Sequence, residues 1–234
     1  MRSKSEIRKE VWSEMEEEGV ARFPTPIEGR IPNFVGAEEA AEKLDEVPEF
    51  LEAERVKVNP DSPQNWVRAK VIEKGKVLFM PTPRLREGFL RISPEDVPEG
   101  DEKKATTIKH SGRYGEKIEL EEMEGIDLVV GGSVAVSKNG KRVGKGGGYS
   151  DLEYAILREL NLGKPAVLTT VHPIQLYSDL PQENHDVPLD WIVTSEQVIE
   201  TKTDLEKPSG IHWELLSEED LKEMPVLKEL KELS

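Results

Sequence analysis

The segment whose residue types most clearly suggest chemistry is a glycine-rich loop, RVGKGGGYSDLEY, at residues 142–154. Glycine tolerates positive φ and has no Cβ, so successive backbone N–H groups can point into one concavity. The helix expected to begin near Ser150 adds the positive end of its dipole. Together these groups would form a cradle for a polyphosphate. Its glycines and basic residues are Arg142, Gly144, Lys145, Gly146, Gly147 and Gly148.

The spacing in this loop does not match the two common phosphate-binding motifs. No G-K-[ST] follows at Walker spacing, and G-x-G-x-x-G cannot be laid over residues 144–149. The preceding SKNGK is typical of a turn, so a structural hairpin-to-helix loop is the alternative to a phosphate site. Asp151, in the first helical turn, can either cap the helix or hold the Mg²⁺ that accompanies a nucleotide.

A second acidic cluster, ENHDVPLD, lies at residues 183–190. Asp186 or His185 can join Asp151 at a metal, and the alternative is a solvated turn with His185 exposed. A lone histidine such as His172, at the end of an expected strand, is more often a packed or capping residue. No pair of histidines has the spacing of zinc ligands.

Two cations near the N-terminus fall on the apolar side of an expected helix. Apolar residues recur at helical spacing over residues 3–18, and Lys4 and Arg8 lie within the arc they span. One interpretation is that their stems pack while their charged heads reach solvent at the rim. The other is that both side chains reach inward to an anion.

The elements that must position these residues alternate along the chain. Apolar runs predict strands at 54–58, 76–83, 125–136, 165–172 and 189–195. Helical patterns cover 36–44, 62–75 and 150–163, with Ser62 expected as an N-cap and Gly163 as a terminator. This order predicts an α/β fold, a mainly parallel sheet with helices on both faces. The glycine loop would then lie beyond the C-terminal ends of the strands, where such sheets bind ligands.

Length and composition limit the remaining possibilities. We expect the 234 residues to form a single domain, with 93–119 a loop or insertion and 200–234 a partly helical C-terminal extension. The absence of a membrane-length apolar run, a signal-peptide pattern and any cysteine predicts a cytoplasmic protein. A net charge of −15 argues against nucleic-acid or anionic-membrane partners, although a local basic pocket is compatible with it. Monomer and homodimer both remain open.

Four segments together resemble the 5-formyltetrahydrofolate cyclo-ligase family, over about residues 3–200. They are Lys4-x-x-x-Arg8, VLFMPTPRLREG, IDLVVGGSVAVSKNGKRVGKGGGYSDLEY and ENHDVPLDWIV. The resemblance is closest to the methenyltetrahydrofolate synthetase domain-containing branch and its archaeal relatives, which share RIPNF and PTPRLR. It implies a Rossmann-like three-layer fold and an ATP- and Mg²⁺-dependent closure of 5-formyltetrahydrofolate, or of a modified pterin, through a phosphorylated formyl group. The alternatives are an ATP-dependent enzyme of the same fold acting on another substrate, and a non-catalytic nucleotide-binding or interaction module.

The resemblance also implies roles for individual residues. Lys4 and Arg8 match the family's N-terminal ATP contacts, and Asp151 and Asp186 match its metal-linked aspartates. The counterparts of its phosphate loop are Arg142, Gly144, Gly146, Gly148 and Tyr149. We assign catalysis to Arg142, Lys145 and Tyr149, with Lys145 as a displaced loop cation.

The same comparison shows where this chain departs from the family and which residues would meet the substrate. Gly147 stands where the family's loop has Lys or Met, and Ser150 replaces a tyrosine that could stack on a pterin. Candidates for substrate contacts are Arg84 and Arg86, for an acidic folate tail, and Glu39 or its neighbour Glu38, for the family's folate-contacting glutamate.

Overall fold

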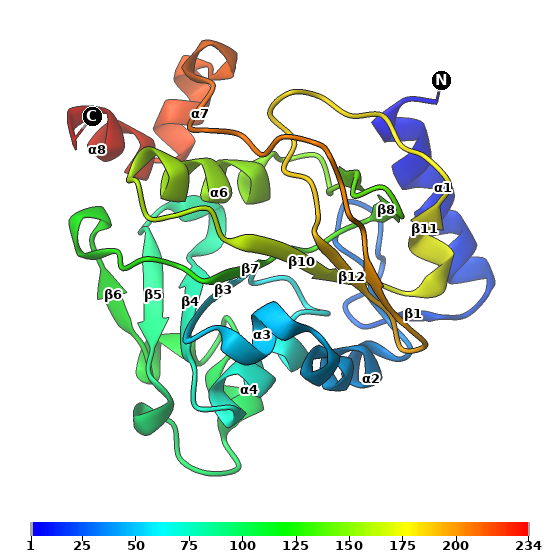
Figure 1. Cartoon of the computed structure of the whole chain (residues 1–234), viewed down its shortest axis with the longest axis horizontal. Helices are drawn as coiled ribbons and strands as arrows, with labels where there is room; N and C mark the ends of the chain where they lie inside the picture. The colour runs from blue at the N-terminus through cyan, green and yellow to red at the C-terminus, as the bar shows by residue number, and fades with distance from the viewer. Residues whose placement is uncertain (1, 234) are drawn as a thin grey trace.

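An eight-stranded sheet forms the middle layer of the chain, which the computed structural model describes over residues 2–233 (Figure 1). The strand order is β13–β12–β10–β7–β3–β4–β5–β6. Five central strands are parallel: β3 (Arg55–Val58), β4 (Val77–Pro81), β7 (Leu128–Val130), β10 (Ala166–Thr170) and β12 (Trp191–Val193). The other three strands are antiparallel to their neighbours: β5 (Phe89–Ile92) and the edge strand β6 (Glu116–Ile118) at one side, and the edge strand β13 (Val198–Glu200) at the other. The expected mainly parallel sheet is confirmed.

Helices cover both faces of this sheet, as the α/β prediction requires (Figure 1). One face carries α6 (Tyr149–Glu159), α7 (Glu218–Glu223) and α8 (Val226–Leu233), and the other carries α2 (Ala37–Glu42), α3 (Pro48–Glu52) and α4 (Asn65–Glu73). Each interface encloses its own apolar core, with Tyr154 and Leu227 in the first and Phe50 and Val71 in the second. The central strand β7 is buried along its whole length, because both of its faces are covered.

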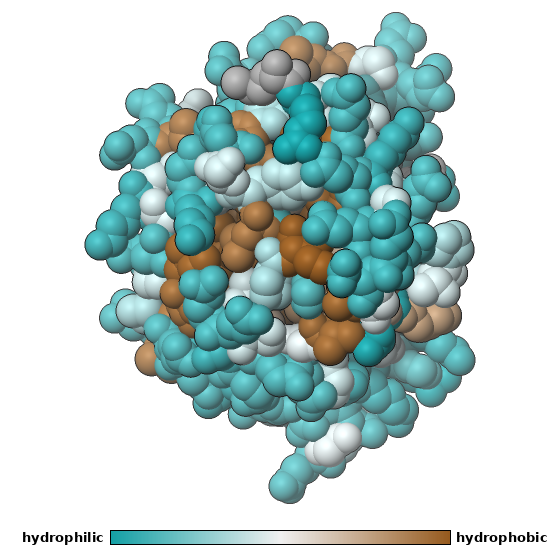
Figure 2. Space-filling view, turned by 90° about the vertical axis from the view of Figure 1, so that its right-hand side faces the viewer, coloured by the Kyte–Doolittle hydropathy of each residue, from teal (hydrophilic) through white to brown (hydrophobic). Residues whose placement is uncertain are grey.

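Helix α1 (Lys4–Glu17) lies at the side of the sheet (Figure 1). Ser3 caps it in a reciprocal hydrogen-bonded arrangement with Glu6, which satisfies two N-terminal donors. Its buried stripe consists of Ile7, Val11, Trp12 and Met15, as the spacing predicted. Figure 2 shows that the surface on this side is mostly hydrophilic, with hydrophobic side chains gathered near its centre.

The apolar run 125–136 is not one strand, contrary to our prediction. β7 ends at Val130, and the chain leaves the main sheet at two glycines before β8 (Ala135–Ser137) joins a separate three-stranded sheet. A Cβ at Gly132 would lie 2.9 Å from Ile31, so the close approach at this departure requires glycine. The other strands of the small sheet are β9 (Arg142–Val143) and β11 (Leu176–Tyr177). The glycine loop therefore extends from the β8–β9 hairpin, whose SKNGK turn was recognised from the sequence.

Two expected helix ends are also displaced. α4 begins at Asn65, whose N–H donates to Ser62 O at 3.1 Å, so Ser62 belongs to a preceding turn and is not the N-cap. α6 ends at Glu159, four residues before Gly163. Asn161 takes the left-handed conformation after it, with φ +57°, which asparagine tolerates better than most residues.

Residues 93–119 contain α5 (Glu102–Ala105) and β6, and are tied to the sheet layer by buried Arg68, whose Nε donates to Thr106 O at 2.8 Å. A short antiparallel pair, β1 (Ala21–Arg22) and β2 (Asn33–Phe34), lies beside α1. Short 3₁₀ turns cover Lys43–Glu46, Pro83–Leu85, Pro94–Asp96, Ser111–Arg113, Leu120–Glu122, Pro173–Gln175 and Trp213–Leu215. Among the described helices, none combines the length and the apolarity that crossing a bilayer would take.

Candidate active site

A cleft of about 1030 Å³ opens at the C-terminal ends of the parallel strands. Asn59 and Asp61 follow β3, Thr82 follows β4 and Gly132 follows β7, and all four line it. This is the position at which open α/β sheets bind ligands. Lys4 and Arg8 of α1 and the glycine loop 144–148 close it from the other side.

The cleft concentrates positive charge on an acidic protein. Of the described residues that line it, eight are Lys or Arg and five are Asp or Glu, whereas the whole chain carries a net charge of −15. A cleft lined by one sign of charge focuses the field and raises the local concentration of the opposite ion. An anionic ligand is therefore favoured here and disfavoured over most of the remaining surface.

The glycine loop takes a conformation that other residues would strain. Gly146 and Gly148 have φ of +108° and +67°, in the left-handed region. Gly147 has an ordinary φ, but a Cβ there would lie 2.7 Å from Cε2 of Tyr149, whose ring folds back over the loop. Gly148 is the N-cap of α6 and has no side chain to cap the first-turn N–H groups, which leaves the positive end of the helix to a ligand.

Lys4 and Arg8 both point into the cleft. The Lys4 ammonium lies 2.6 Å from Asp186 and 2.5 Å from Glu183. Nε of Arg8 donates to Gly144 O at 2.6 Å, and its guanidinium lies against Gly146. Burial lowers the pKa of Arg8, while Asp186 and Glu183 oppose that shift. The first helix thus contributes one cation to the acidic loop and one to the glycine loop.

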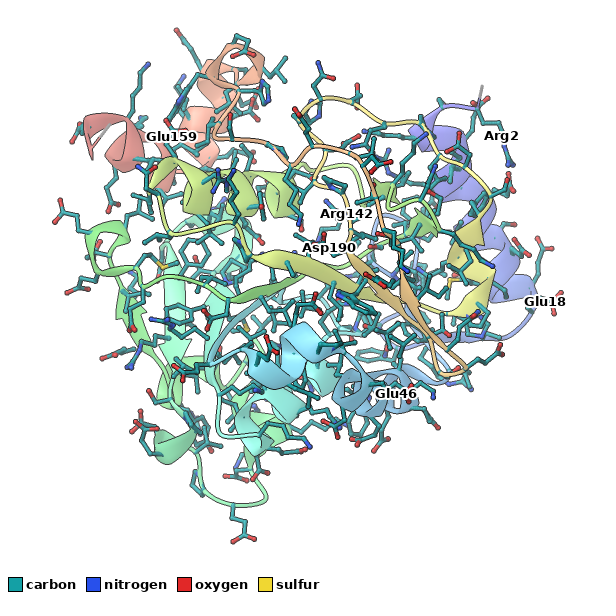
Figure 3. All side chains as sticks on the ribbon, in the orientation of Figure 1. Arg2, Glu18, Glu46, Arg142, Glu159 and Asp190 are labelled. Carbon is teal, nitrogen blue, oxygen red and sulfur yellow. The ribbon has the colours of Figure 1, made fainter. Side chains whose placement is uncertain are left out.

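Arg142 and Asp151 form a buried link beneath the glycine loop. Arg142 Nη2 donates to Asp151 Oδ1 at 2.6 Å, and Nη1 donates to Gly132 O at 2.9 Å. The same Asp151 oxygen accepts the N–H of Val187 at 3.0 Å. Burial opposes the charge of Arg142, but Asp151, together with Asp186 and Glu153, outweighs burial and raises the pKa of Arg142. Figure 3 shows Arg142 in the interior of the molecule, where it joins β9 to α6.

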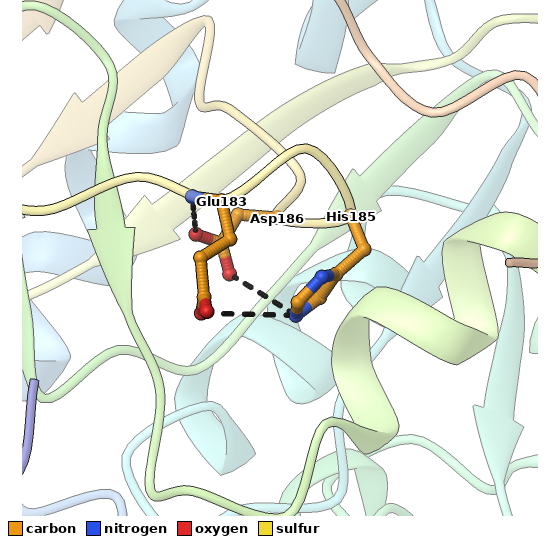
Figure 4. A group of neighbouring side chains, drawn as sticks. All are labelled: Glu183, His185 and Asp186. Atoms are coloured by element: carbon orange, nitrogen blue, oxygen red, sulfur yellow. Dashed lines mark hydrogen bonds and ion pairs between the residues drawn. The ribbon is translucent and has the colours of Figure 1, made fainter. Parts of the chain in front are cut away.

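The residues that could hold a metal lie in the 183–186 loop (Figure 4). Glu183, His185 and Asp186 each offer a ligand atom, and these atoms lie within 4.8 Å of one another. Asp151, expected to share a metal with Asp186, is not part of this group, because one of its oxygens is committed to Arg142 and Val187. The hydrogen bond from Lys4 lowers the pKa of Glu183. Carboxylate oxygens suit Mg²⁺, and this pair already binds one cation, the Lys4 ammonium.

Lys145 extends across the cleft to a carboxylate that we did not identify from the sequence. Its Nζ lies 2.7 Å from Asp61 Oδ1. The available signal was the position of Asp61 directly after the strand that became β3, where a side chain faces the ligand-binding edge of the sheet.

A buried ion pair beside the cleft was also missed. Lys57 of β3 donates to Glu153 of α6 and, at 2.8 Å, to Asn59 Oδ1. Both charged side chains are almost fully buried. Burial raises the pKa of Glu153 and Lys57 opposes the shift. The pair holds α6, and therefore the end of the glycine loop that precedes it, against the sheet.

The expected substrate residues do not gather in the cleft. Glu39 is exposed on α2, whose buried face is made of alanines, and Arg86 is exposed after a 3₁₀ turn; neither lines the cleft. Glu38 is likewise exposed, and the side chain of Arg84 lies outside the described residues. The wall of the cleft opposite the glycine loop instead comes from α4, α5 and the segment after α5: Asn65, Trp66, Arg68, Lys103, Thr107 and Ile108.

The C-terminal segment also contacts the glycine loop. The hydroxyl of Tyr149 donates to Glu223 of α7 at 3.3 Å. Since the ring of the same tyrosine covers Gly147, the last helices contribute to the position of an aromatic residue at the site.

The chain is similar to known proteins along most of its length. Residues 1–195 match the sequence profile of the 5-formyltetrahydrofolate cyclo-ligase family. The methenyltetrahydrofolate synthase domain-containing protein of Bos taurus is 43% identical over 240 residues, which cover 98% of this chain and 62% of that protein. Its counterpart in Homo sapiens is 40% identical over 239 residues, covering 98% and 61%. This chain therefore spans about 62% of the length of such relatives.

Solved structures support the fold. The NMR structure of Aquifex aeolicus 5,10-methenyltetrahydrofolate synthetase matches with a TM-score of 0.54 and 22% identity, over 91% of this chain and 99% of that one. At that level of identity the match concerns the arrangement of the elements, which agrees with the Rossmann-like three-layer fold expected from the sequence.

Proposed function

The chain belongs to the 5-formyltetrahydrofolate cyclo-ligase family, and we propose that it is an ATP- and Mg²⁺-dependent ligase that closes 5-formyltetrahydrofolate, or a modified pterin, to the 5,10-methenyl form. One observation carries the proposal: a glycine loop and inward-pointing cations meet in one large cleft at the ligand-binding edge of the sheet. A polyphosphate and a second anionic molecule fit such a cleft on charge.

The proposed reaction has two steps. The formyl oxygen attacks the γ-phosphorus of ATP, the bond from that phosphorus to the β–γ bridging oxygen breaks, and ADP leaves. N10 then attacks the activated formyl carbon and loses its proton, and the former formyl oxygen departs with the phosphate. The products are 5,10-methenyltetrahydrofolate, ADP and inorganic phosphate. Such chemistry requires mainly alignment and neutralisation of developing charge.

The residues of the loop divide these tasks. We assign the triphosphate to the backbone N–H groups of residues 144–148 and to the Arg8 guanidinium, whose terminal nitrogens have no hydrogen-bond partner within the described part of the chain. Lys145 supplies the mobile cation, since its side chain is 40% exposed and its partner Asp61 is also in the cleft. Arg142 was expected to be catalytic; its bonds to Asp151 and Gly132 assign it to positioning the loop.

The acidic loop is the proposed metal site. Glu183 and Asp186 would hold Mg²⁺, which supplies neutralisation of the phosphate charge when it is bound. Lys4 would then give up its bonds to these carboxylates and turn toward the phosphates. Asp61 takes the place of Glu39 as the proposed carboxylate for the substrate ring, because it lines the cleft and Glu39 does not.

The test is turnover of 5-formyltetrahydrofolate by the purified protein with ATP and Mg²⁺, following the methenyl product by its absorbance, with ATP omitted as control. ATP-dependent product would support the cyclo-ligase. Nucleotide binding without product would favour one of two alternatives: an ATP-dependent enzyme of the same fold on another substrate, or a non-catalytic nucleotide-binding module. A panel of substrates separates those two.

A further inference from the structure

The wall of the cleft opposite the glycine loop presents a fixed aromatic ring. Trp66 of α4 lines the cleft, and it is the one tryptophan among the described residues that does so. It is half-buried and packs against two of the three apolar cores, the one under α4 and the one under α1. A ring supported from two sides is held in place, so its free face offers a rigid, planar apolar surface.

A lysine covers that face in the structure. Nζ of Lys103, an exposed side chain, lies 2.9 Å from the centroid of the Trp66 ring. An exposed cation–π contact of this kind is weak, because the ammonium remains largely hydrated. Lys103 can therefore leave the ring when a better partner for the indole arrives.

Exposed apolar side chains also line the cleft. Phe23 is 81% exposed and Ile108 is 55% exposed. Together with Trp66 they give the lining an apolar component beside the cations and glycines of the loop. The cleft can therefore accommodate a ligand that combines charged groups with an apolar ring.

Polar groups suited to the edge of a heterocycle line the same cleft as the ring. Asn59 and Asp61 follow β3, and Asn65 immediately precedes Trp66. Asn65 is held by Arg68, whose Nη2 donates to its Oδ1 at 3.2 Å, so its amide is oriented. Carboxylate and amide groups can accept from and donate to the ring nitrogens and amino groups of a planar heterocycle.

We propose that Trp66 is the stacking surface for a planar nitrogen heterocycle, and that Lys103 leaves the indole face when this ring binds. The inference deepens the proposed function, since it takes the two heterocycles of that reaction, the pterin and the adenine, as the candidate occupants. It also accounts for Ser150: the aromatic face that the glycine loop lacks is supplied by the opposite wall. Stacking on Trp66 requires no change in the conformation of the glycine loop.

The experiment follows tryptophan fluorescence and binding heat while Mg²⁺–AMP-PNP and 5-formyltetrahydrofolate are titrated separately into the wild type, Trp66→Phe, Trp66→Leu and Trp191→Phe. Trp191 lies on β12, away from the cleft, and is the matched control. We expect one of the two ligands to quench the wild type and Trp191→Phe but not Trp66→Phe. Trp66→Leu should weaken the same ligand by roughly five- to 150-fold, the range measured for base stacking on aromatic side chains.

The ligand that loses affinity identifies the occupant, pterin or adenine. Because Trp66 packs on two cores, Trp66→Leu can be destabilised, and Lys103→Ala, at an exposed position, provides a second variant that leaves the core intact. It should bind the stacked ligand as tightly as the wild type or a few-fold more tightly, because no long side chain then covers the ring face. Quenching that persists in Trp66→Phe, or a loss of affinity in Lys103→Ala, would overturn the inference.

Failure of the stacking surface can be told apart from failure of the proposed cyclo-ligase activity, because turnover is measured on the same proteins. Quenching through Trp66 in a wild type without turnover would keep the stacking surface and reject the cyclo-ligase. ATP-dependent turnover with an unchanged KM for both substrates in Trp66→Leu would keep the cyclo-ligase and reject the stacking surface.

Discussion

Lys145 of the glycine loop and Asp61 at the end of β3 meet across the cleft, with 2.7 Å between Nζ and Oδ1. The two residues are far apart in the sequence, and their contact brings the loop to the edge of the sheet. An ion pair with one exposed partner contributes little to stability, so its lysine can exchange a carboxylate for a phosphate at small cost. The Lys145 side chain can therefore leave Asp61 when an anionic ligand binds.

Lys145→Ala is expected to raise the dissociation constant for Mg²⁺–ATP by about tenfold or more. A hydrogen bond to a charged group is worth about 1.5–3 kcal/mol, and the variant also leaves Asp61 as an uncompensated negative charge near the phosphates. Isothermal titration calorimetry measures the change. Lys141→Ala is the matched control, because Lys141 pairs with Asp179 at 2.7 Å outside the cleft. An unchanged affinity in Lys145→Ala would show that this side chain does not serve as the loop's cation.

Gly147→Ala is expected to lower both nucleotide affinity and turnover, because the new methyl would lie 2.7 Å from the Tyr149 ring. The ring or the loop must move, and a displaced loop no longer presents its N–H groups together. Gly112→Ala is the control, since a Cβ there meets nothing within 4 Å. The double variant Gly147→Ala/Tyr149→Ala should recover part of the affinity, because the clash disappears with the ring. If the double variant binds no better than Gly147→Ala, the effect does not come from this contact.

Glu153→Met is expected to destabilise the fold by about 3–5 kcal/mol, because it leaves the buried Lys57 ammonium with Asn59 as its remaining partner. Urea unfolding at pH 7 gives the value. Lys57→Met/Glu153→Met should lose less than the sum of the two single variants, since the double change removes both buried charges. Additive losses would mean that the two side chains do not stabilise each other.

The alternation of elements was predictable, because apolar runs and helical periodicity are local properties of the chain. The break between β7 and β8 at Gly131 and Gly132 was not predictable, because a continuous apolar run gives the same pattern whether its residues belong to one sheet or to two. The strands β5 and β6 were also missed. Both are short, and two of the three residues of β6, Glu116 and Lys117, are exposed and charged, so neither strand gives a long apolar run. The start of α4 was misplaced because Ser62, a residue type typical of N-caps, lies in the turn before the helix.

The glycine loop was predictable for the same local reason, because glycines indicate backbone conformations and close approaches that other residues cannot adopt. The position of Lys4 and Arg8 inside an apolar helical arc was also visible in the sequence, but two directions remained open there, toward solvent or inward, and in the structure both residues line the cleft. Asp61 and Trp66 were not predicted. Both residues matter because they line the same cleft as the glycine loop, and they reach it only through the folding of segments that are far apart in the sequence. Glu39 was proposed by analogy of residue type, and type alone does not determine which face of α2 is buried.

The Lys4–Glu183 contact should contribute to stability in a pH-dependent way. Lys4 lowers the pKa of Glu183 below its ordinary 4.5. A carboxyl whose pKa is depressed by folding stabilises the fold above its unfolded pKa, and loses that contribution as the pH falls through the folded value. The difference in unfolding free energy between wild type and Lys4→Met should thus be constant from pH 6 to 8, and shrink below about pH 4.5. Urea titrations across this range measure it, with exposed Lys9→Met as control. A difference that stays constant into acid would mean that Lys4 stabilises α1 by packing its stem and not through this carboxylate.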